Sequence, residues 1–559
     1  MSIMIGIDLG TSTTEAAVFR DGKPEMVVNL EGRVVTPSVV GVDPAGNWLV
    51  GEKAKAQYLL FPENTAIEIK RKTGSDETIP IGKANYAPVE LQAKLLSYVR
   101  NYVTTYLGED VTQAVISVPA YFNEHQRRET RLAGERAGFS VERILNEPTA
   151  AAMSYGLEHM EEESHVLVYD LGGGTFDVTL LEMFDGVLEV KASSGDNQLG
   201  GKDFDEKLMD ELCARFLKKF GVLLREDKYA MVRLKDEAER CKLALSEGDE
   251  CRVRIPAICT VKGEPVGLDE TITREQFEAL TRELLERTHA PIDSVLRDAE
   301  LGDEDIDHII LVGGSTRMPM VASDIERYLG QPPVSAVDPD YAVAQGTAIM
   351  AGIISGEMDD ETGLVMTDVN PFTLGVRTAD GDDNDHMSVV IPRNTTIPVT
   401  RTEGYTTSGD YQTEAKIEVY QGESEIASHN HFLGEFTIGG IPPRPAGREK
   451  LSVTFAYDLN GLLNVTATLV STGKNASIEI DMGRKARRDV SGWKDAEGAK
   501  SYRTLIRTAE RMLKRDDLAV GMRERIEDTV YRLKVALLDG DGAKALSDDL
   551  NSLLNEARD

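Results

Sequence analysis

The first 360 or so residues alternate short apolar runs with longer amphipathic stretches. Many of the apolar runs are bounded by glycine, as in MIGIDLG, AVISVPA, HVLVYDLGGG and HIILVGGS. Between them lie segments with helical spacing, such as PVELQAKLLSYVRNYV. Buried strands that alternate with helices are typical of an α/β domain. We therefore predict that fold for this part of the chain.

Residues 370–482 change to a period of two, which is typical of half-buried strands. The segment LSVTFAYDLNGLLNVTATLV contains Asn460-Gly461, a pair that favours a tight hairpin turn. We predict a β-hairpin whose buried face carries Leu451, Val453, Phe455 and Tyr457 before the turn, and Leu463, Val465 and Ala467 after it.

Residues 500–557 return to the spacing of an amphipathic helix. Two short polar breaks, RDD at 515–517 and DGDG at 539–542, divide this segment and predict a three-helix bundle. The apolar stripes consist of Met522, Ile526, Val530, Leu533 and Leu537, and of Leu546, Leu550 and Leu553.

The segment GLVMTDVNP joins the first two regions. Leu364, Val365 and Met366 are apolar, whereas a flexible tether is usually polar. Two interpretations stay open at this point. The segment is either a short first strand of the β region or a linker that docks against the first domain and releases from it.

Charge and composition narrow the function classes. With 62 Lys and Arg against 95 Asp and Glu, the formal net charge is −33, which repels nucleic acid and anionic membranes. The four cysteines show no CxxC spacing, which argues against a zinc site or a disulfide framework. The N-terminus has no basic region, and no stretch reaches the roughly 18 apolar residues of a membrane span. We therefore expect a cytoplasmic protein that uses neither nucleic acid nor membrane as a primary partner.

A weak internal repeat points to phosphate chemistry. IGIDLGTSTT (residues 5–14) is echoed by VYDLGGGTFD (168–177), and each copy has a strand, Asp-Leu-Gly and a tight turn. Glycine lets backbone N–H groups approach phosphate oxygens, and the aspartate can hold Mg²⁺ through water. GxxxxGK[ST] and GxGxxG are both absent, which excludes a P-loop NTPase and a Rossmann site on motif grounds. We predict two related lobes that face each other across a nucleotide cleft.

Longer strings identify a family. IGIDLGTSTTEAAV, ISVPAYFNEHQRRETRLAGERAGF, RILNEPTAAAMSYG, VYDLGGGTFDVTLLE, GDNQLGGKDFDEKL, ILVGGSTRMP and DPDYAVAQGTA resemble, in order, the motifs of the DnaK-type heat-shock chaperones. Actins and sugar kinases share the paired hairpins but have neither NEPTAAA nor VPAYFN. The resemblance covers residues 3–482 well and the helical tail loosely.

The resemblance implies a multidomain protein with an actin-like ATPase domain. The expected order is a two-lobed nucleotide-binding domain at residues 1–360, an interdomain linker at 361–369, a β-sandwich substrate-binding domain at 370–488 and a shortened helical lid bundle at 489–559. The expected cofactors are ATP or ADP, Mg²⁺ and K⁺. The expected partners are unfolded polypeptide clients, a J-domain co-chaperone and a nucleotide exchange factor of the GrpE type.

The resemblance also assigns roles within the ATPase domain. Asp8 and Asp170 position the metal ions, Lys70 reaches the γ-phosphate, and Glu147 with Thr175 orients the attacking water. Phosphoryl transfer needs mainly this positioning and charge neutralisation. The phosphates are cradled by Gly10, Thr11, Ser12 and Thr13 from one lobe, and by Gly172, Gly173, Gly174, Gly200 and Gly201 from the other. The adenosine is contacted by Glu239, Lys242 and Ser246, and its pocket is closed by Gly313, Gly314, Ser315, Arg317 and Asp340.

Further positions match the family's relay and peptide pocket. Pro119, Arg127 and Asp368 correspond to the relay from nucleotide to linker. The peptide pocket corresponds to Val376, Thr378, Tyr405, Ala415 and Ile417, with Ala379 and Ser408 at the two arch positions.

Two departures from the family pattern stand out. Ala415 occupies a position that usually carries Val, and Ala379 and Ser408 occupy the arch positions, so we expect a wider pocket with a thinner arch and weaker binding of Leu-centred peptides. Only about 20 residues separate Met482 from the helical bundle, so we expect a short lid arm and faster peptide release.

Other functions remain as alternatives to a general chaperone. One is a specialised ATP-driven reactivase or assembly factor for a single client. The others are a small-molecule kinase and an actin-like filament, and the additional β domain argues against both.

Overall fold

The structure is a computed structural model of the chain. It describes residues 3–75, 77–157, 159, 163–334, 338–358, 365–380, 383–458, 462–481, 493 and 498–513, and single helical positions between 526 and 554. Two compact units emerge. The first comprises Met1–Thr373, Ile391–Thr400 and Ala456–Leu462, and the second comprises Leu374–Val390, Arg401–Phe455 and Leu463–Asp559. The inclusion of residues 391–400 in the first unit was not expected from sequence. The domain boundaries at 360, 369 and 488 stay predictions.

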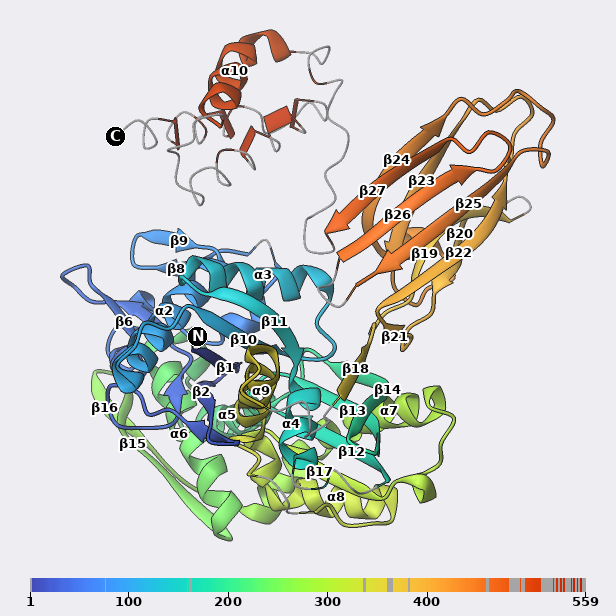
Figure 1. Cartoon of the computed structure of the whole chain (residues 1–559). Helices are drawn as coiled ribbons and strands as arrows, with labels where there is room; N and C mark the ends of the chain where they lie inside the picture. Colours follow the sequence, from blue (N-terminus) through green and yellow to red (C-terminus); the bar gives the residue numbers. More distant parts are fainter. Residues whose placement is uncertain are drawn as a thin grey trace. The chain divides into compact units, whose positions relative to one another are not determined.

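Two large sheets form the first unit (Figure 1). One has the strand order β11-β10-β1-β2-β3, with β4 (Thr36–Pro37) paired to β2. Its strands are β1 (Met4–Leu9), β2 (Thr13–Arg20), β3 (Lys23–Met26), β10 (Gln113–Val118) and β11 (Ser140–Asn146). The other has the order β17-β12-β13-β14-β18-β21. Its strands are β12 (Ser164–Leu171), β13 (Phe176–Phe184), β14 (Val187–Asp196), β17 (His308–Val312), β18 (Val365–Val369) and β21 (Thr396–Ile397).

Helices α4 (Glu147–Gly156) and α9 (Ala342–Ser355) pack on each other between these sheets. Helix α9 contacts β1 and β2, and α4 contacts β12 and β13. Close approach of the two helices requires glycine, because a Cβ at Gly346 would lie 1.7 Å from the carbonyl oxygen of Ala150. Their apolar side chains share one buried core that includes Ala150, Met153, Ile349 and Met350.

Further helices cover the outer faces of the sheets. The alternation of β1 places Ile5, Ile7 and Leu9 in a core with helix α2 (Pro88–Leu107). Helix α2 starts with Pro88 in its first turn and ends at Gly108, whose φ of 72° suits a left-handed cap. The other α-helices that the structure describes in this unit are α1 (Glu52–Tyr58), α3 (Glu124–Arg136), α5 (Gly201–Phe220), α6 (Lys228–Glu247), α7 (Arg274–Asp298) and α8 (Pro319–Leu329).

Small sheets complete the outer parts of the first unit. Strands β15 (Glu250–Val261) and β16 (Glu264–Thr273) form a long hairpin. The others are β5 (Val40–Val42), β6 (Trp48–Val50) and β7 (Thr65–Ala66) in one sheet, and β8 (Ile79–Ile81) and β9 (Ala84–Tyr86) in another. Among the described residues, none of the helices is long and apolar enough to cross a membrane.

The second unit contains two four-stranded sheets (Figure 1). One has the order β20 (Asp383–Ile391), β19 (Leu374–Asp380), β23 (Glu414–Gln421) and β24 (His431–Gly439), and the other β22 (Val399–Thr406), β25 (Lys450–Tyr457), β26 (Leu462–Leu469) and β27 (Asn475–Asp481). The predicted alternation is confirmed. Its seven apolar positions from Leu451 to Ala467 are all buried. The Asn460-Gly461 turn lies outside the described residues.

The helical tail has a core of its own among the positions that the structure describes. Helix α10 (Arg503–Met512) contributes Ile506, Ala509 and Met512. Both predicted stripes join that core through Ile526, Val530, Leu533 and Leu537, and through Leu550 and Leu553, with Leu546 partly buried. Met522 lies outside the described residues.

Candidate active site

The two Asp-Leu-Gly motifs fold into the same hairpin in two different sheets. Strand β1 pairs antiparallel with β2 and parallel with β10. Strand β12 pairs antiparallel with β13 and parallel with β17. Asp8 and Asp170 hold equivalent places, one residue before Leu9 and Leu171 at the strand ends. The predicted internal repeat is therefore present as a repeated topology.

The two hairpin turns face each other at close range. A Cβ at Gly173 would lie 2.2 Å from the Ser12 hydroxyl oxygen, and a Cβ at Gly174 would lie 2.7 Å from a Thr11 methyl carbon. A Cβ at Gly200 would lie 2.4 Å from the Gly174 nitrogen. At Gly200, only glycine permits this approach of one backbone to another. The structure thus brings together the two predicted phosphate loops.

Lys70 lies at the centre of a buried charge cluster. Its side chain is 5% exposed and forms an ion pair with Glu147, which is 9% exposed. Burial, followed by the charge of Glu147, raises the pKa of Asp8 to about 7, against the opposing effects of Lys70 and a 2.8 Å hydrogen bond from Ser117. Burial and then Glu147 also hold the pKa of Asp170 well above its ordinary value.

Two more carboxyl groups extend the cluster. Burial, followed by Glu147, raises the pKa of Asp177 to about 7, although the Tyr121 amide donates a 2.9 Å hydrogen bond to it. Burial, followed by Asp8, places the pKa of Glu15 well above its ordinary value. Neither residue was predicted from sequence as part of the site. Asp177 lies directly opposite Asp170 in its hairpin, and Glu15 lies directly opposite Asp8. These strand registers are the feature that identifies them as part of the site.

This excess of carboxylates fits a divalent cation. Lys70 pairs with Glu147 and acts electrostatically on four other buried carboxyl groups, those of Asp8, Glu15, Asp170 and Asp177. Oδ2 of Asp177 is buried and has no hydrogen-bond partner. Among the described residues, no group of three or more potential ligands is close enough to hold a metal directly. That arrangement suits Mg²⁺, which keeps several waters and binds through one or two carboxylates and phosphate.

The second phosphate loop is fixed by the start of α5 and by neighbouring side chains. The Gly201 amide donates to the Gly172 oxygen at 2.9 Å, and the Ser315 hydroxyl donates to the same oxygen at 2.8 Å. Lys242 donates to the Gly201 oxygen at 3.0 Å and pairs with Asp205 at 2.8 Å. Thr175 closes the turn, since its oxygen accepts from the Gly172 amide at 3.0 Å.

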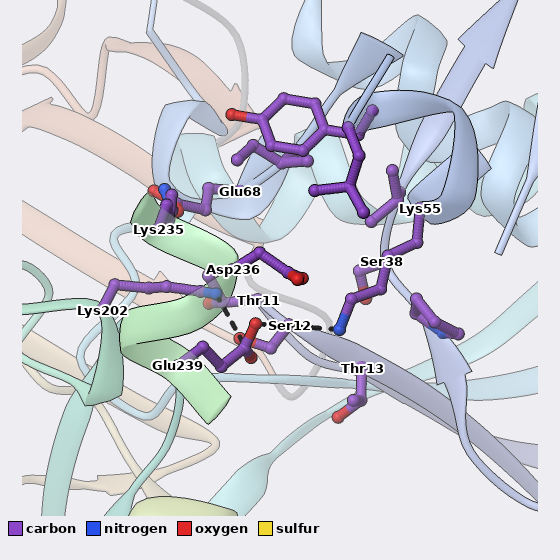
Figure 2. Close-up of a pocket in the computed structure, with 15 residues that line it drawn as sticks. Thr11, Ser12, Thr13, Ser38, Lys55, Glu68, Lys202, Lys235, Asp236 and Glu239 are labelled. Atoms are coloured by element: carbon purple, nitrogen blue, oxygen red, sulfur yellow. Dashed lines mark hydrogen bonds and ion pairs between the residues drawn. The ribbon is translucent and has the colours of Figure 1, made fainter. Parts of the chain in front are cut away.

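Helix α6 forms a wall of a small cavity (Figure 2). Glu239 lies between Lys55 and Lys202, each at 3.7 Å. Thr11, Ser12 and Thr13 also line this cavity, whose volume is about 100 Å³. Ligand pockets commonly measure about 300–1,000 Å³, so the walls must separate to admit a nucleoside triphosphate.

Most of the remaining residues that were predicted to contact the nucleotide lie around a third loop. Gly313 has a φ of 82°, and a Cβ there would lie 2.5 Å from the Leu171 oxygen. Arg317 pairs with Asp338 at 2.7 Å and with Asp340 at 2.6 Å. A Cβ at Gly314 would lie 3.2 Å from Asp340. Ser246, at the end of α6, donates within the helix to the Lys242 oxygen at 3.2 Å.

Sequence reasoning missed an exposed leucine on α6. Leu243 follows Glu239 by four residues and precedes Ser246 by three, so all three share one helical face. Its side chain is 59% exposed. The available signal was an apolar residue in the string ERCKLALS on the same helical face as residues predicted to contact the nucleotide.

The segment that joins the two regions forms a strand of the first unit. Val365–Val369 is β18, which pairs parallel with β14 and antiparallel with β21. This is the docked arrangement, one of the two interpretations left open by sequence. Leu364 lies outside the described residues.

The predicted relay residues meet through an asparagine that sequence reasoning missed. The Asn146 amide donates two 2.9 Å hydrogen bonds to the Asp368 carboxylate, and Arg127 donates to the Asn146 oxygen at 2.6 Å. Arg127 also donates to the Ala120 oxygen at 2.9 Å, within the turn that follows Pro119. Asn146 directly precedes Glu147, so the motif NEPTA already contained it.

The positions expected to form the peptide pocket lie on three strands of the second unit. Val376 is buried on β19, which pairs with β23, the strand of Ala415 and Ile417. Tyr405 on β22 shares a 3.0 Å hydrogen bond with Ser388 on β20. Thr378, Tyr405, Ala415 and Ile417 are partly buried, whereas Ala379 and Ser408 are exposed.

Comparison with known proteins agrees with this arrangement. A family model described as Hsp70 protein matches residues 4–81 and 76–558. Chaperone protein DnaK of Thermotoga petrophila is 44% identical over 561 residues, and the match covers 100% of this chain and 92% of the relative. Proteins of the same description in Thermosipho africanus and Thermosipho melanesiensis are 43% identical over 560 and 562 residues, with the same coverage. The chain therefore belongs to the Hsp70 family, whose members are ATPases that bind ATP or ADP with Mg²⁺, and it is an ATP-dependent chaperone of unfolded polypeptides.

Proposed function

We propose that ATP hydrolysis in the first unit controls how tightly the second unit binds an extended peptide. One observation carries this proposal. Asn146 hydrogen-bonds to Asp368 of β18, and the next residue, Glu147, is paired with Lys70. A change at the phosphate site that moves Glu147 also moves Asn146, because the two are adjacent in the chain. Differential affinity for two conformations then links nucleotide to peptide.

The chain's own residues divide the work of hydrolysis. Lys70 neutralises the transferred phosphoryl group, and Glu147 with Thr175 aligns the attacking water. The backbone amides of Gly10–Thr13 and Gly172–Gly174 hold the phosphates from both sides. Asp8 and Asp170 would hold Mg²⁺, and that ion would supply charge neutralisation to the phosphates. The same carboxylates provide sites for K⁺.

Adenosine contacts one face of α6. Glu239, Lys242 and Ser246 supply polar contacts, and Leu243 offers an apolar surface to the base. Gly313, Gly314, Ser315, Arg317 and Asp340 close the opposite side. Nucleotide enters when the walls of the 100 Å³ cavity move apart. An exchange factor of the GrpE type that holds these walls apart would speed ADP release. A J-domain protein would stimulate ATP hydrolysis. We place this cycle in the cytoplasm.

The decisive experiment measures ATP turnover and peptide affinity in the full chain. Lys70→Ala and Asp170→Asn should each lower turnover by at least about 100-fold, while a labelled unfolded peptide still binds in ADP. Lys72→Ala is the matched control. Lys72 lies in the same 3-10 helix as Lys70 (Ile69–Lys72), but its side chain pairs with Glu77 at the surface. Equal peptide affinity in ATP and ADP for the unaltered protein would contradict the proposal, as would normal turnover in Lys70→Ala.

The peptide pocket should be wider than in relatives with Val at position 415. Ala415→Val adds two carbon atoms and should tighten binding of a Leu-centred peptide by up to about 15-fold, because each buried CH₂ contributes roughly 0.8 kcal/mol. Peptide arrays of both forms test this. If the unaltered protein already binds Leu-centred peptides as tightly as Ala415→Val does, the prediction of a wider pocket is wrong.

The short lid arm should shorten the lifetime of the peptide complex. We expect release in ADP to be faster than from a relative with a longer arm. Stopped-flow release of one labelled peptide from both proteins measures the difference. Equal release rates would remove this part of the proposal.

A further inference from the structure

Glu68 adopts an uncommon, left-handed backbone conformation. Its φ of 56° and ψ of 31° lie in the left-handed region, which an L-residue with a Cβ adopts at an energetic cost. Glu68 immediately precedes the 3-10 helix Ile69–Lys72, and its carbonyl oxygen accepts a 3.1 Å hydrogen bond from the Arg71 amide. The conformation of Glu68 therefore sets the start of the turn that carries Lys70.

Lys235 of α6 holds the Glu68 side chain. The two form an ion pair, with side chains 26% and 22% exposed respectively, and Figure 2 shows their tips meeting at the rim of the cavity. Burial acts to raise the pKa of Glu68, but Lys235, and after it Lys202 and Arg71, more than offset that effect and bring it below the ordinary value. The carboxylate is therefore ionised at neutral pH.

The same helix carries the proposed adenosine contacts. Glu239 follows Lys235 by four residues and Lys242 by seven, so all three lie along one face of α6. Lys242 is fixed to the second phosphate loop through the Gly201 oxygen. A shift of α6 thus acts on Glu68 and on the nucleotide contacts together.

We propose that Glu68 is a positioning residue for Lys70, through its ion pair with Lys235. The pair keeps the left-handed turn in place, and the turn aims Lys70 at Glu147 and the phosphates. Closure of α6 over a nucleotide is in this way transmitted to the group that neutralises the γ-phosphate. This inference rests on the role proposed above for Lys70.

The test separates hydrolysis from nucleotide release. Glu68→Gln and Lys235→Gln should each slow single-turnover hydrolysis by about 5-fold, the factor that about 1 kcal/mol of lost alignment produces. Release of a fluorescent ADP analogue should change by less than about 2-fold. The charge-exchanged double variant, Glu68→Lys with Lys235→Glu, should recover most of the hydrolysis rate. A contact that merely closes the cleft would instead change release and leave hydrolysis intact.

Glu77→Gln provides the matched control. It removes a surface ion pair of the same 3-10 helix, with Lys72 at 2.9 Å, and does not touch α6. It should leave both rates unchanged. Unchanged hydrolysis in Glu68→Gln, or no recovery in the double variant, overturns the inference. If Glu68→Gln does not fold, the same comparison between Lys235→Gln and the double variant decides.

Lys70→Ala separates a failure of the role proposed for Lys70 from a failure of the positioning role proposed for Glu68. If turnover survives in Lys70→Ala, the role proposed for Lys70 is wrong. If turnover is lost in Lys70→Ala but normal in Glu68→Gln and Lys235→Gln, only the positioning role is wrong.

Discussion

The two large sheets of the first unit share a central plan and differ at their edges. In both, an antiparallel hairpin carries the aspartate and a parallel strand flanks it, β10 in one sheet and β17 in the other. The first sheet continues beyond the flanking strand with β11, which leads into Glu147. The second sheet continues beyond β14 with β18, the strand that leads to the second unit. The repeated part contains the residues proposed above to hold phosphate, and the parts that differ contain those proposed to carry the coupling.

The two hairpin turns also differ in how much space their first glycines leave. A Cβ at Gly10 would lie 2.4 Å from the Thr13 carbonyl oxygen, a backbone atom that cannot move aside cheaply. At the equivalent Gly172, the nearest atom would be the Thr175 oxygen at 3.6 Å, an ordinary contact. The first turn is therefore the tighter of two turns built to the same pattern.

The largest effect is expected from this difference. Gly10→Ala should weaken ATP binding by about 10- to 100-fold, because overpacking costs about 1–3 kcal/mol and the turn must open to relieve it. Gly172→Ala should change binding by less than about 2-fold. Calorimetric titration with ATP and Mg²⁺ measures both. Equal losses in the two variants would show that the turns are equivalent after all.

The next effect concerns the edge strands. Asp368→Ala removes the acceptor of two Asn146 hydrogen bonds, so β18 should leave β14 more often and its amides should exchange with deuterium about 10-fold faster. Asp185→Asn, at the exposed turn between β13 and β14, is the control and should leave exchange unaltered. Unchanged exchange at 365–369 in Asp368→Ala would mean that strand pairing alone holds β18.

The smallest effect is expected on α6. Leu243→Ala should weaken ADP binding by about 3- to 5-fold, through the loss of roughly 1 kcal/mol of apolar contact with the base. Leu217→Ala on α5, also an exposed leucine, should have no effect. Fluorescence titration with a labelled ADP measures both. Identical affinities in the two variants would remove Leu243 from the proposed adenosine contacts.

The sequence predicted the repeated plan well and the contacts between distant segments poorly. Asp8, Asp170 and the glycine turns lie in local motifs, and local strand and turn chemistry was enough to find them. Asn146 and Asp368 are 222 residues apart, and neither local motif predicts a contact with the other residue. The docking of β18 likewise depends on the free edge of β14. Such pairings are decided by tertiary packing, which a local pattern does not encode.

The second unit shows the same limit in another form. Alternation correctly predicted which residues of β25 and β26 are buried, because each strand has one face in the core. The hydrogen bond between Tyr405 and Ser388 joins strands of different sheets, so its partners could not be paired from periodicity. Glu15 and Asp177 of the first unit were missed for a similar reason. Their closeness to Asp8 and Asp170 depends on the register of paired strands, which periodicity does not give.

The parallel pairing of β18 has a consequence for the state in which it departs. Residues 187–189 of β14 then present unpaired backbone amides and carbonyls along an open margin. Such a margin is a template for any extended chain, including those of aggregating proteins. If the nucleotide cycle releases β18, as proposed above, the first unit briefly exposes a strand edge of the kind on which unfolded chains aggregate.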